Sequence, residues 1–178
     1  TVISNGVEVD RYKDSVFTDD FPLEIDESCN NIIFVGRLSE EKCLPILFDA
    51  IKIVKTKFDN IRLIVVGGGP LLEKYKKMTA LENMDRYIKF TGMIPNKILL
   101  GSGVLKKMKF FVTPSTSENQ PMTILESIMF GLPIVRADAK GNPELIEDNG
   151  FKVRPNDIDD MAEKIIALLS NEQLRINF

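Results

Sequence analysis

The sequence contains no histidine among its 178 residues, and this absence limits the chemistry that the chain can carry. Histidine is the commonest general base in enzymes and the commonest side-chain ligand of metal ions. Any catalysis by this chain must therefore use carboxylates, amines, backbone groups or the ligand itself.

Cysteine is also scarce, because the chain has only Cys29 and Cys43. The two do not form a close C-x-x-C pair and are too few for a disulfide framework, which predicts a reducing compartment. No apolar run approaches the roughly 18 residues of a membrane span, and the opening residues, TVISNGVEVD, lack the charged and apolar regions of a signal peptide. We therefore expect a cytoplasmic chain.

The chain has no excess of positive charge, since its net charge is −3 at pH 7. The chain as a whole then has no attraction to nucleic acid or to an anionic bilayer, and a basic site can only be local. We expect no nucleic-acid partner. With 44% apolar and 28% charged residues, the chain suits one globular domain with a real core.

Short runs rich in β-branched and aromatic residues alternate with longer helical patterns. The predicted strands are 31–36, 61–67, 87–92, 108–114 and 132–137, and the predicted helices are 44–58, 70–83, 96–108, 121–130 and 157–174. This alternation predicts parallel strands joined by right-handed crossovers, hence an α/β fold with a doubly wound parallel sheet. Residues 1–30 are polar and poorly periodic, and we interpret them as a linker before a domain of residues 31–178.

Ligands of such sheets bind at the carboxyl ends of the strands, where loops meet helix N-termini. The first strand ends at Gly36, and Arg37 and Lys42 then bracket the start of the following helix. A planar guanidinium and a mobile ammonium in this place predict a diphosphate clamp. The alternative is that both are solvated loop charges, as most arginines and lysines are.

The second strand ends in GGGP, residues 67–70. This run lacks the Lys-Ser/Thr of a P-loop and the spacing of G-x-G-x-x-G. Pro70 suits the first turn of a helix, so the glycines are explained by a tight turn from strand to helix. Close approach of a ligand to the glycine backbone is the alternative.

Two carboxylates follow the fourth strand, Glu118 and Glu126. Pro121 favours the first turn of a helix, which places Glu118 in the loop and Glu126 inside the helix. The first backbone N–H groups, at Met122 and Thr123, would attract an anion. A carboxylate beside them could bind the vicinal hydroxyls of a ribose, whereas the alternative is that both glutamates are ordinary surface charges.

Six segments, in this order, resemble the C-terminal, donor-binding domain of glycosyltransferase family 4, which comprises retaining enzymes of the two-domain GT-B fold. They are SNGVEVDRY near the start, FVGRLSEEK, LIVVGGGP, IKFTGMIP, VTPSTSENQPMTILESIMFGLPIV with its E-x7-E pair, and GNPELIEDNGFKV. The resemblance covers nearly the whole chain and implies a Rossmann-like domain that binds a nucleotide-diphosphate sugar of UDP or GDP type.

By this resemblance, the donor diphosphate would be held by Gly36, Arg37 and Lys42, with backbone N–H groups around Met122 and Thr123. The positive side chains and the helix dipole would replace a metal ion on the leaving diphosphate. No metal or other cofactor is then expected in this domain.

The resemblance also implies roles for four further residues. Glu126 would bind the ribose hydroxyls, and Glu118 would be the catalytic contact to the transferred hexose. The backbone near Met93 and Ile94 would border the base.

The resemblance implies an N-terminal, acceptor-binding domain, which we expect to lie outside this chain. We therefore expect this fragment to bind nucleotide weakly and to transfer no sugar, and we expect that the parent enzyme could lie peripherally on the cytoplasmic membrane face. The chain departs from the family at Cys43, where glycine is usual, and at Asn119-Gln120, where Gly-Phe is common. These changes put the turn near the phosphates and the details of sugar contact in question.

Two other functions remain open on the sequence alone. A stand-alone nucleotide-binding module without transferase activity would need no second α/β domain upstream. A dinucleotide-dependent oxidoreductase is disfavoured because the chain has no G-x-G-x-x-G.

Overall fold

Six parallel strands form one sheet in the computed structural model, which describes residues 20–116, 122–138 and 148–178. Their order across the sheet is β3-β2-β1-β4-β5-β6, which is the Rossmann order. The strands are β1 Asn30–Val35, β2 Ile61–Val66, β3 Ile88–Gly92, β4 Phe111–Thr113, β5 Ile134–Ala137 and β6 Gly150–Val153. The predicted doubly wound α/β sheet is thus confirmed.

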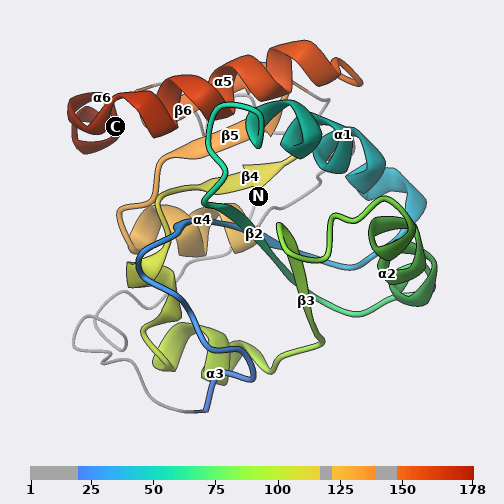
Figure 1. Ribbon diagram of the computed structural model, residues 1–178. Coiled ribbons are helices and arrows are strands. Elements are labelled where there is room, and N and C mark those ends of the chain that lie inside the picture. The colour runs from blue at the N-terminus through green and yellow to red at the C-terminus, as the bar shows by residue number, and fades with distance from the viewer. Residues whose placement is uncertain (1–19, 117–121, 139–147) are drawn as a thin grey trace, which may run out of the picture.

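Helices cover both faces of this sheet (Figure 1). Within the described ranges, the α-helices are α1 Leu44–Val54, α2 Leu72–Leu81, α3 Asn96–Gly101, α4 Met122–Met129, α5 Ile158–Ser170 and α6 Glu172–Asn177, and the 3₁₀ turns are η2 Glu40–Lys42 and η3 Val104–Lys107. α1 and α5 pack against each other on one face, whereas α3 and α4 lie on the other (Figure 1).

The strands are buried on both sides, as their continuous apolar runs predict. Successive residues of β1 show this: Ile32 and Phe34 belong to one buried cluster, which includes residues of α1 and α5. Ile33, between them, belongs to a second cluster with residues of α3 and α4. The alternation follows from the two-residue period of a strand.

Two predicted helices are wrong in extent. The helix predicted over 44–58 ends at Val54, and the last residues form turns before β2. The helix predicted over 157–174 is interrupted at Asn171, whose side-chain oxygen accepts a hydrogen bond of 2.9 Å from the Leu174 N–H. Asparagine is a strong N-cap because it satisfies a free N–H of the next helix, and so α6 begins there.

The weak helix predicted over 96–108 is shorter than expected. Gly103 has a φ of +69° and separates α3 from η3, because glycine adopts this left-handed region without steric cost.

The sequence prediction also missed the strand β6, which pairs in parallel with β5. Its four residues, GFKV, begin with a glycine, and glycine is depleted in strands.

The described part of the N-terminal segment is packed onto the domain. Phe21 and Ile25 are buried in the cluster on the α3 and α4 side, and the Glu27 carboxylate lies 2.6 Å from the Lys107 ammonium. The boundary at residue 30, between linker and domain, stays a prediction.

Candidate functional site

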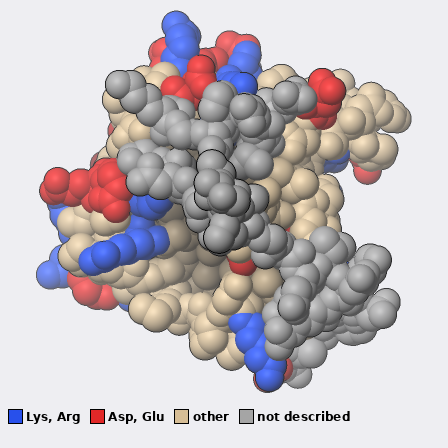
Figure 2. All heavy atoms as spheres, turned by 180° about the vertical axis from the view of Figure 1, so that it is seen from behind, with Lys and Arg blue, Asp and Glu red and all other residues tan. Residues whose placement is uncertain are grey.

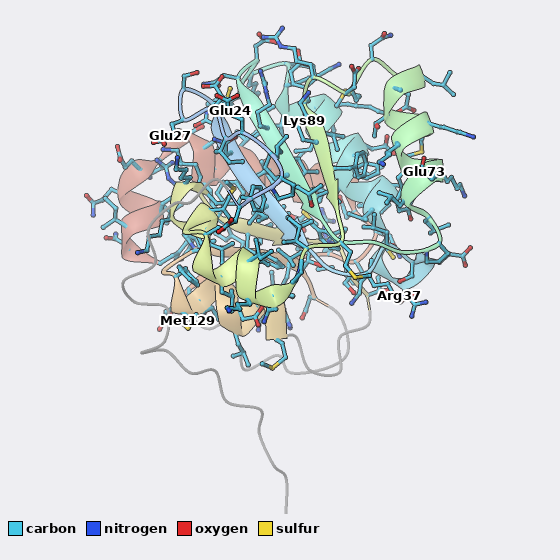
Figure 3. The ribbon with its side chains drawn as sticks, turned by 90° about the horizontal axis from the view of Figure 1, so that it is seen from below. Glu24, Glu27, Arg37, Glu73, Lys89 and Met129 are labelled. Carbon is cyan, nitrogen blue, oxygen red and sulfur yellow. The ribbon has the colours of Figure 1, made fainter. Side chains whose placement is uncertain are left out.

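The order of the strands creates a switch point between β1 and β4. These neighbours are joined to strands on opposite sides, since β1 leads to β2 and β4 leads to β5. The loops at the carboxyl ends of two such strands diverge and leave a crevice, which is where open α/β sheets bind ligands. In Figure 3, Arg37 lies at the end of the strands opposite Glu27 and Lys89. The predicted phosphate clamp therefore follows β1 at the switch point.

The loop after β1 carries the predicted diphosphate ligands. Arg37 is exposed, and Lys42 is half-buried at the end of the η2 turn. Cys43 then adopts the left-handed conformation, with φ +49° and ψ +31°, as the residue before α1. This conformation costs a non-glycine residue about 1–2 kcal/mol. Cys43 therefore makes the turn in a conformation that glycine favours.

This loop is attached to the loop that follows β4. The carbonyl oxygen of Glu41 accepts hydrogen bonds from the Thr116 N–H at 3.3 Å and from the Ser115 hydroxyl at 3.4 Å. The Cys43 sulfur lies 3.7 Å from the Thr116 hydroxyl oxygen. These contacts fix the segment that carries Lys42 relative to the strand exit that precedes α4.

The glycines after β2 pack against the same loop. Gly67 has φ +146°, and a Cβ placed on it would lie 1.9 Å from the Gly36 carbonyl oxygen. Gly69 has φ +152°, and its Cβ would lie 2.5 Å from the Leu38 oxygen. The Leu38 N–H in turn donates to the Gly68 oxygen at 2.9 Å. The glycines thus serve a tight turn and the close packing of two strand-exit loops.

A pocket of about 490 Å³ lies between these loops and the segment after β3. It is lined by Val35, Gly36, Arg37, Val66, Gly67, Gly68, Gly69, Met93 and Ile94. Ligand pockets typically measure about 300–1,000 Å³ and combine apolar walls with a few polar groups. The pocket therefore brings together four of the predicted site residues, which are Gly36, Arg37, Met93 and Ile94. The Met93 residue is 82% exposed, so it is accessible to a ligand.

Glu126 is not a surface charge, because this residue of α4 is buried and only 6% exposed. The Asn96 side-chain amide donates a hydrogen bond of 2.8 Å to its Oε1 atom. Burial raises the pKa of Glu126 above the ordinary value, and the Asn96 hydrogen bond partly opposes this, since burial disfavours the charged form. The surface-charge interpretation of Glu126 is therefore wrong.

Some of the predicted residues can be placed only in part. α4 begins at Met122 and includes Thr123, close to the predicted start of this helix. Glu118 and Pro121 lie outside the described residues, and the catalytic role of Glu118 stays a prediction. The predicted roles of Gly36, Arg37, Lys42, Met122 and Thr123 as ligands of the diphosphate likewise stay predictions.

Asn96 is the site residue that sequence reasoning missed. It is the first residue of α3 and directly follows GMIP, at the exit of β3. The signal that could have identified Asn96 is its position as a polar residue at a strand exit. Its hydrogen bond to Glu126 could not be predicted in this way, because Glu126 is thirty residues further along the chain.

Other features of the described residues bear on ligands and partners. No group of three or more cysteine, aspartate or glutamate side chains among them could hold a metal ion. None of the helices in the described ranges has both the length and the apolar character of a membrane span. On the face shown in Figure 2, basic and acidic side chains of the described residues are interspersed.

Comparison with known proteins decides the family. The model of the family "Glycosyl transferases group 1" matches residues 15–178. The chain belongs to this family. Its fold is accordingly that of a Rossmann-like domain of the GT-B glycosyltransferases.

Three relatives illustrate the similarity to glycosyl transferases group 1. The alpha-monoglucosyldiacylglycerol synthase of Streptococcus pneumoniae is 35% identical over 152 residues, which cover 83% of this chain and 33% of the synthase. Sulfoquinovosyl transferase SQD2 of Arabidopsis thaliana is 33% identical over 150 residues, which cover 81% of this chain and 27% of the transferase. The structure of a mutant TarM of S. aureus with Fondaparinux, alpha-GlcNAc-glycerol and UDP is 25% identical, has a TM-score of 0.77, and is matched over 90% of this chain and 33% of TarM. The chain thus spans a third or less of each relative.

Proposed function

We propose that the chain is the donor-binding domain of a retaining, family 4 hexosyltransferase and binds a UDP-sugar at the switch point. One observation carries the proposal: the carboxylate of Glu126 is buried and accepts a hydrogen bond from Asn96, which closely follows the pocket residues Met93 and Ile94 in the chain. Burying a carboxylate is costly unless it gains partners. Ribose hydroxyls are donors of the right kind for it.

The proposed chemistry follows from charge development. The bond between the anomeric carbon and the diphosphate oxygen breaks, and the diphosphate leaves with the electron pair. Arg37 and Lys42 stabilise this anion, together with the N–H groups at the start of α4. Glu118 contacts the transferred hexose, and the pocket near Met93 and Ile94 receives the base.

The rest of the reaction needs a second domain. In this proposal, an N-terminal domain of the same enzyme binds the acceptor, which receives the sugar as its hydroxyl proton departs. The isolated chain then binds nucleotide and transfers no sugar. One relative is named alpha-monoglucosyldiacylglycerol synthase, and the glycolipid in this name supports peripheral membrane association of the parent enzyme.

UDP is the proposed nucleotide because the TarM structure contains it at 25% identity. We expect calorimetric titration of the chain to show binding of UDP in preference to GDP and ADP, and no binding of NAD. Preference for GDP would change the proposed base from uracil to guanine and leave the proposed nucleotide site unchanged. Binding of NAD alone would overturn the transferase proposal in favour of a dinucleotide enzyme.

Replacing Glu126 with glutamine separates binding from stability. Burial of the ionised carboxylate is unfavourable, so above the folded-state pKa of Glu126 the change Glu126→Gln should raise the free energy of unfolding by about 1 kcal/mol, a common size for a single stabilising change. The same variant should bind UDP about 10-fold more weakly, because hydrogen bonds to a charged acceptor are the stronger ones. Thermal unfolding and calorimetry measure the two effects.

The pH dependence has a definite sign. The raised pKa of Glu126 means that the folded chain binds a proton more readily than the unfolded chain. Protonation of Glu126 therefore adds to the free energy of unfolding. This contribution is fully present below the unfolded-state pKa and is lost as the pH rises through the folded-state pKa. The stability advantage of glutamine should therefore vanish in acid, and so should the affinity advantage of the wild type for UDP. The affinity ratio of the two chains at each pH cancels protonation of the phosphates, and a ratio independent of pH would contradict the role of Glu126.

A further inference from the structure

We propose that Asn96 is a positioning residue for ribose recognition, which holds the Glu126 carboxylate in the orientation that accepts the two ribose hydroxyls. This inference rests on the proposed function, because it concerns the same nucleotide site. It adds a residue from a different helix to that site, together with a readout that distinguishes positioning from simple stabilisation.

The geometry of the pair supports positioning. The Asn96 Nδ2 atom lies 2.8 Å from Glu126 Oε1, and among the described residues it is the only side-chain or backbone donor to this carboxylate. An unrestrained carboxyl group rotates about its last bond, since such torsions are broad. One hydrogen bond from a separate helix fixes the plane of the carboxylate relative to the sheet edge.

Asn96 does not use its side chain as asparagine usually does near a helix start. Asparagine there commonly caps the helix by accepting from a free backbone N–H. In α3, Pro95 is the N-cap, and the cap makes no side-chain hydrogen bond. The Asn96 amide instead reaches from an otherwise exposed residue to a buried carboxylate. Local helix stability therefore does not explain the contact.

The carboxylate keeps capacity for a ligand. An ionised carboxylate has about four acceptor positions on its two oxygens, and Asn96 occupies one of them. The loop that lines the pocket with Met93 and Ile94 runs directly into Asn96. A nucleoside with its base in that pocket would thus have its ribose next to the Asn96–Glu126 pair.

The test compares UDP with 2′,3′-dideoxy-UDP, which lacks both ribose hydroxyls. For the wild-type chain, the ratio of the Kd for dideoxy-UDP to the Kd for UDP should be at least about 10. Asn96→Ala should lower this ratio by about 5-fold, through weaker UDP binding with unchanged dideoxy-UDP binding, which is the effect of about one ordinary hydrogen bond. Asn96→Asp replaces the donor with an acceptor at nearly the same size and should lower the ratio at least as far.

Lys97→Ala is the matched control, because Lys97 is exposed on the same turn of α3. It should leave the ratio unchanged. If Asn96→Ala and Asn96→Asp keep the wild-type ratio while Glu126→Gln lowers it, Asn96 has no positioning role and the nucleotide site stands. If the wild-type chain binds no nucleotide, the proposed function fails and this inference fails with it.

Discussion

Replacing Gly67 with alanine should lower the free energy of unfolding by about 3 kcal/mol or more, the range of changes that strain a special backbone position. The added Cβ would lie 1.9 Å from the Gly36 carbonyl oxygen and 2.9 Å from its carbonyl carbon. These atoms belong to the backbone and cannot swing aside as a flexible side chain does. The φ of +146° at Gly67 adds strain for any residue with a Cβ. Urea unfolding of the purified variant measures the loss.

Gly68→Ala provides the matched stability control for this change. Its φ is not in the left-handed region, and the nearest atom to its added Cβ is the Met93 Cβ at 3.4 Å, an ordinary contact. We expect its free energy of unfolding to stay within about 1 kcal/mol of the wild type. Equal losses at Gly67 and Gly68 would contradict the close packing of the two strand-exit loops as the reason for the glycines.

Replacing Lys42 with alanine should weaken UDP binding by about 10- to 100-fold, because a hydrogen bond to a charged group contributes about 1.5–3 kcal/mol. Lys42 ends the η2 turn, which is held against the β4 exit through the Glu41 carbonyl. The proposal places its ammonium on the diphosphate. In the whole enzyme, we expect the turnover rate to fall strongly, because the loss of this contact removes about 3 kcal/mol of transition-state stabilisation.

Two comparisons isolate the diphosphate contact of Lys42. Uridine has no phosphates, so Lys42→Ala should leave the calorimetric affinity for uridine unchanged. Lys57→Ala removes the same charge from an exposed residue beyond α1 and should leave the affinity for UDP unchanged. Unaltered UDP binding by Lys42→Ala would remove this lysine from the site.

Much of the fold could be predicted from the sequence because its strands are buried on both faces. Continuous apolar runs such as IIFV and LIVV have one stable place, inside a parallel sheet between helices. The short β6 could not be found, since GFKV carries little apolar character of its own and is a strand because β5 pairs with it. The break at Asn171 depends on a single cap, which competes with an otherwise continuous helical pattern.

The candidate site could be predicted only where position along the chain decides it. The rule that ligands lie at strand exits points to Arg37 and Lys42 without any knowledge of packing. The burial of Glu126 is different, because glutamate is almost always exposed and its burial depends on the way α3 and α4 pack. Its contact with Asn96 is likewise a tertiary contact between separate helices. Such contacts have no local sequence pattern.

The central claim is that the chain binds a nucleotide diphosphate at the carboxyl edge of the sheet. Amide chemical shifts of the isotope-labelled chain during titration with UDP test this claim most directly, because they report the location of binding residue by residue. We predict that the largest changes fall in residues 36–43, 93–96 and 122–126. Changes centred on the opposite edge, around the pocket lined by Met108 and Arg175, would contradict the account.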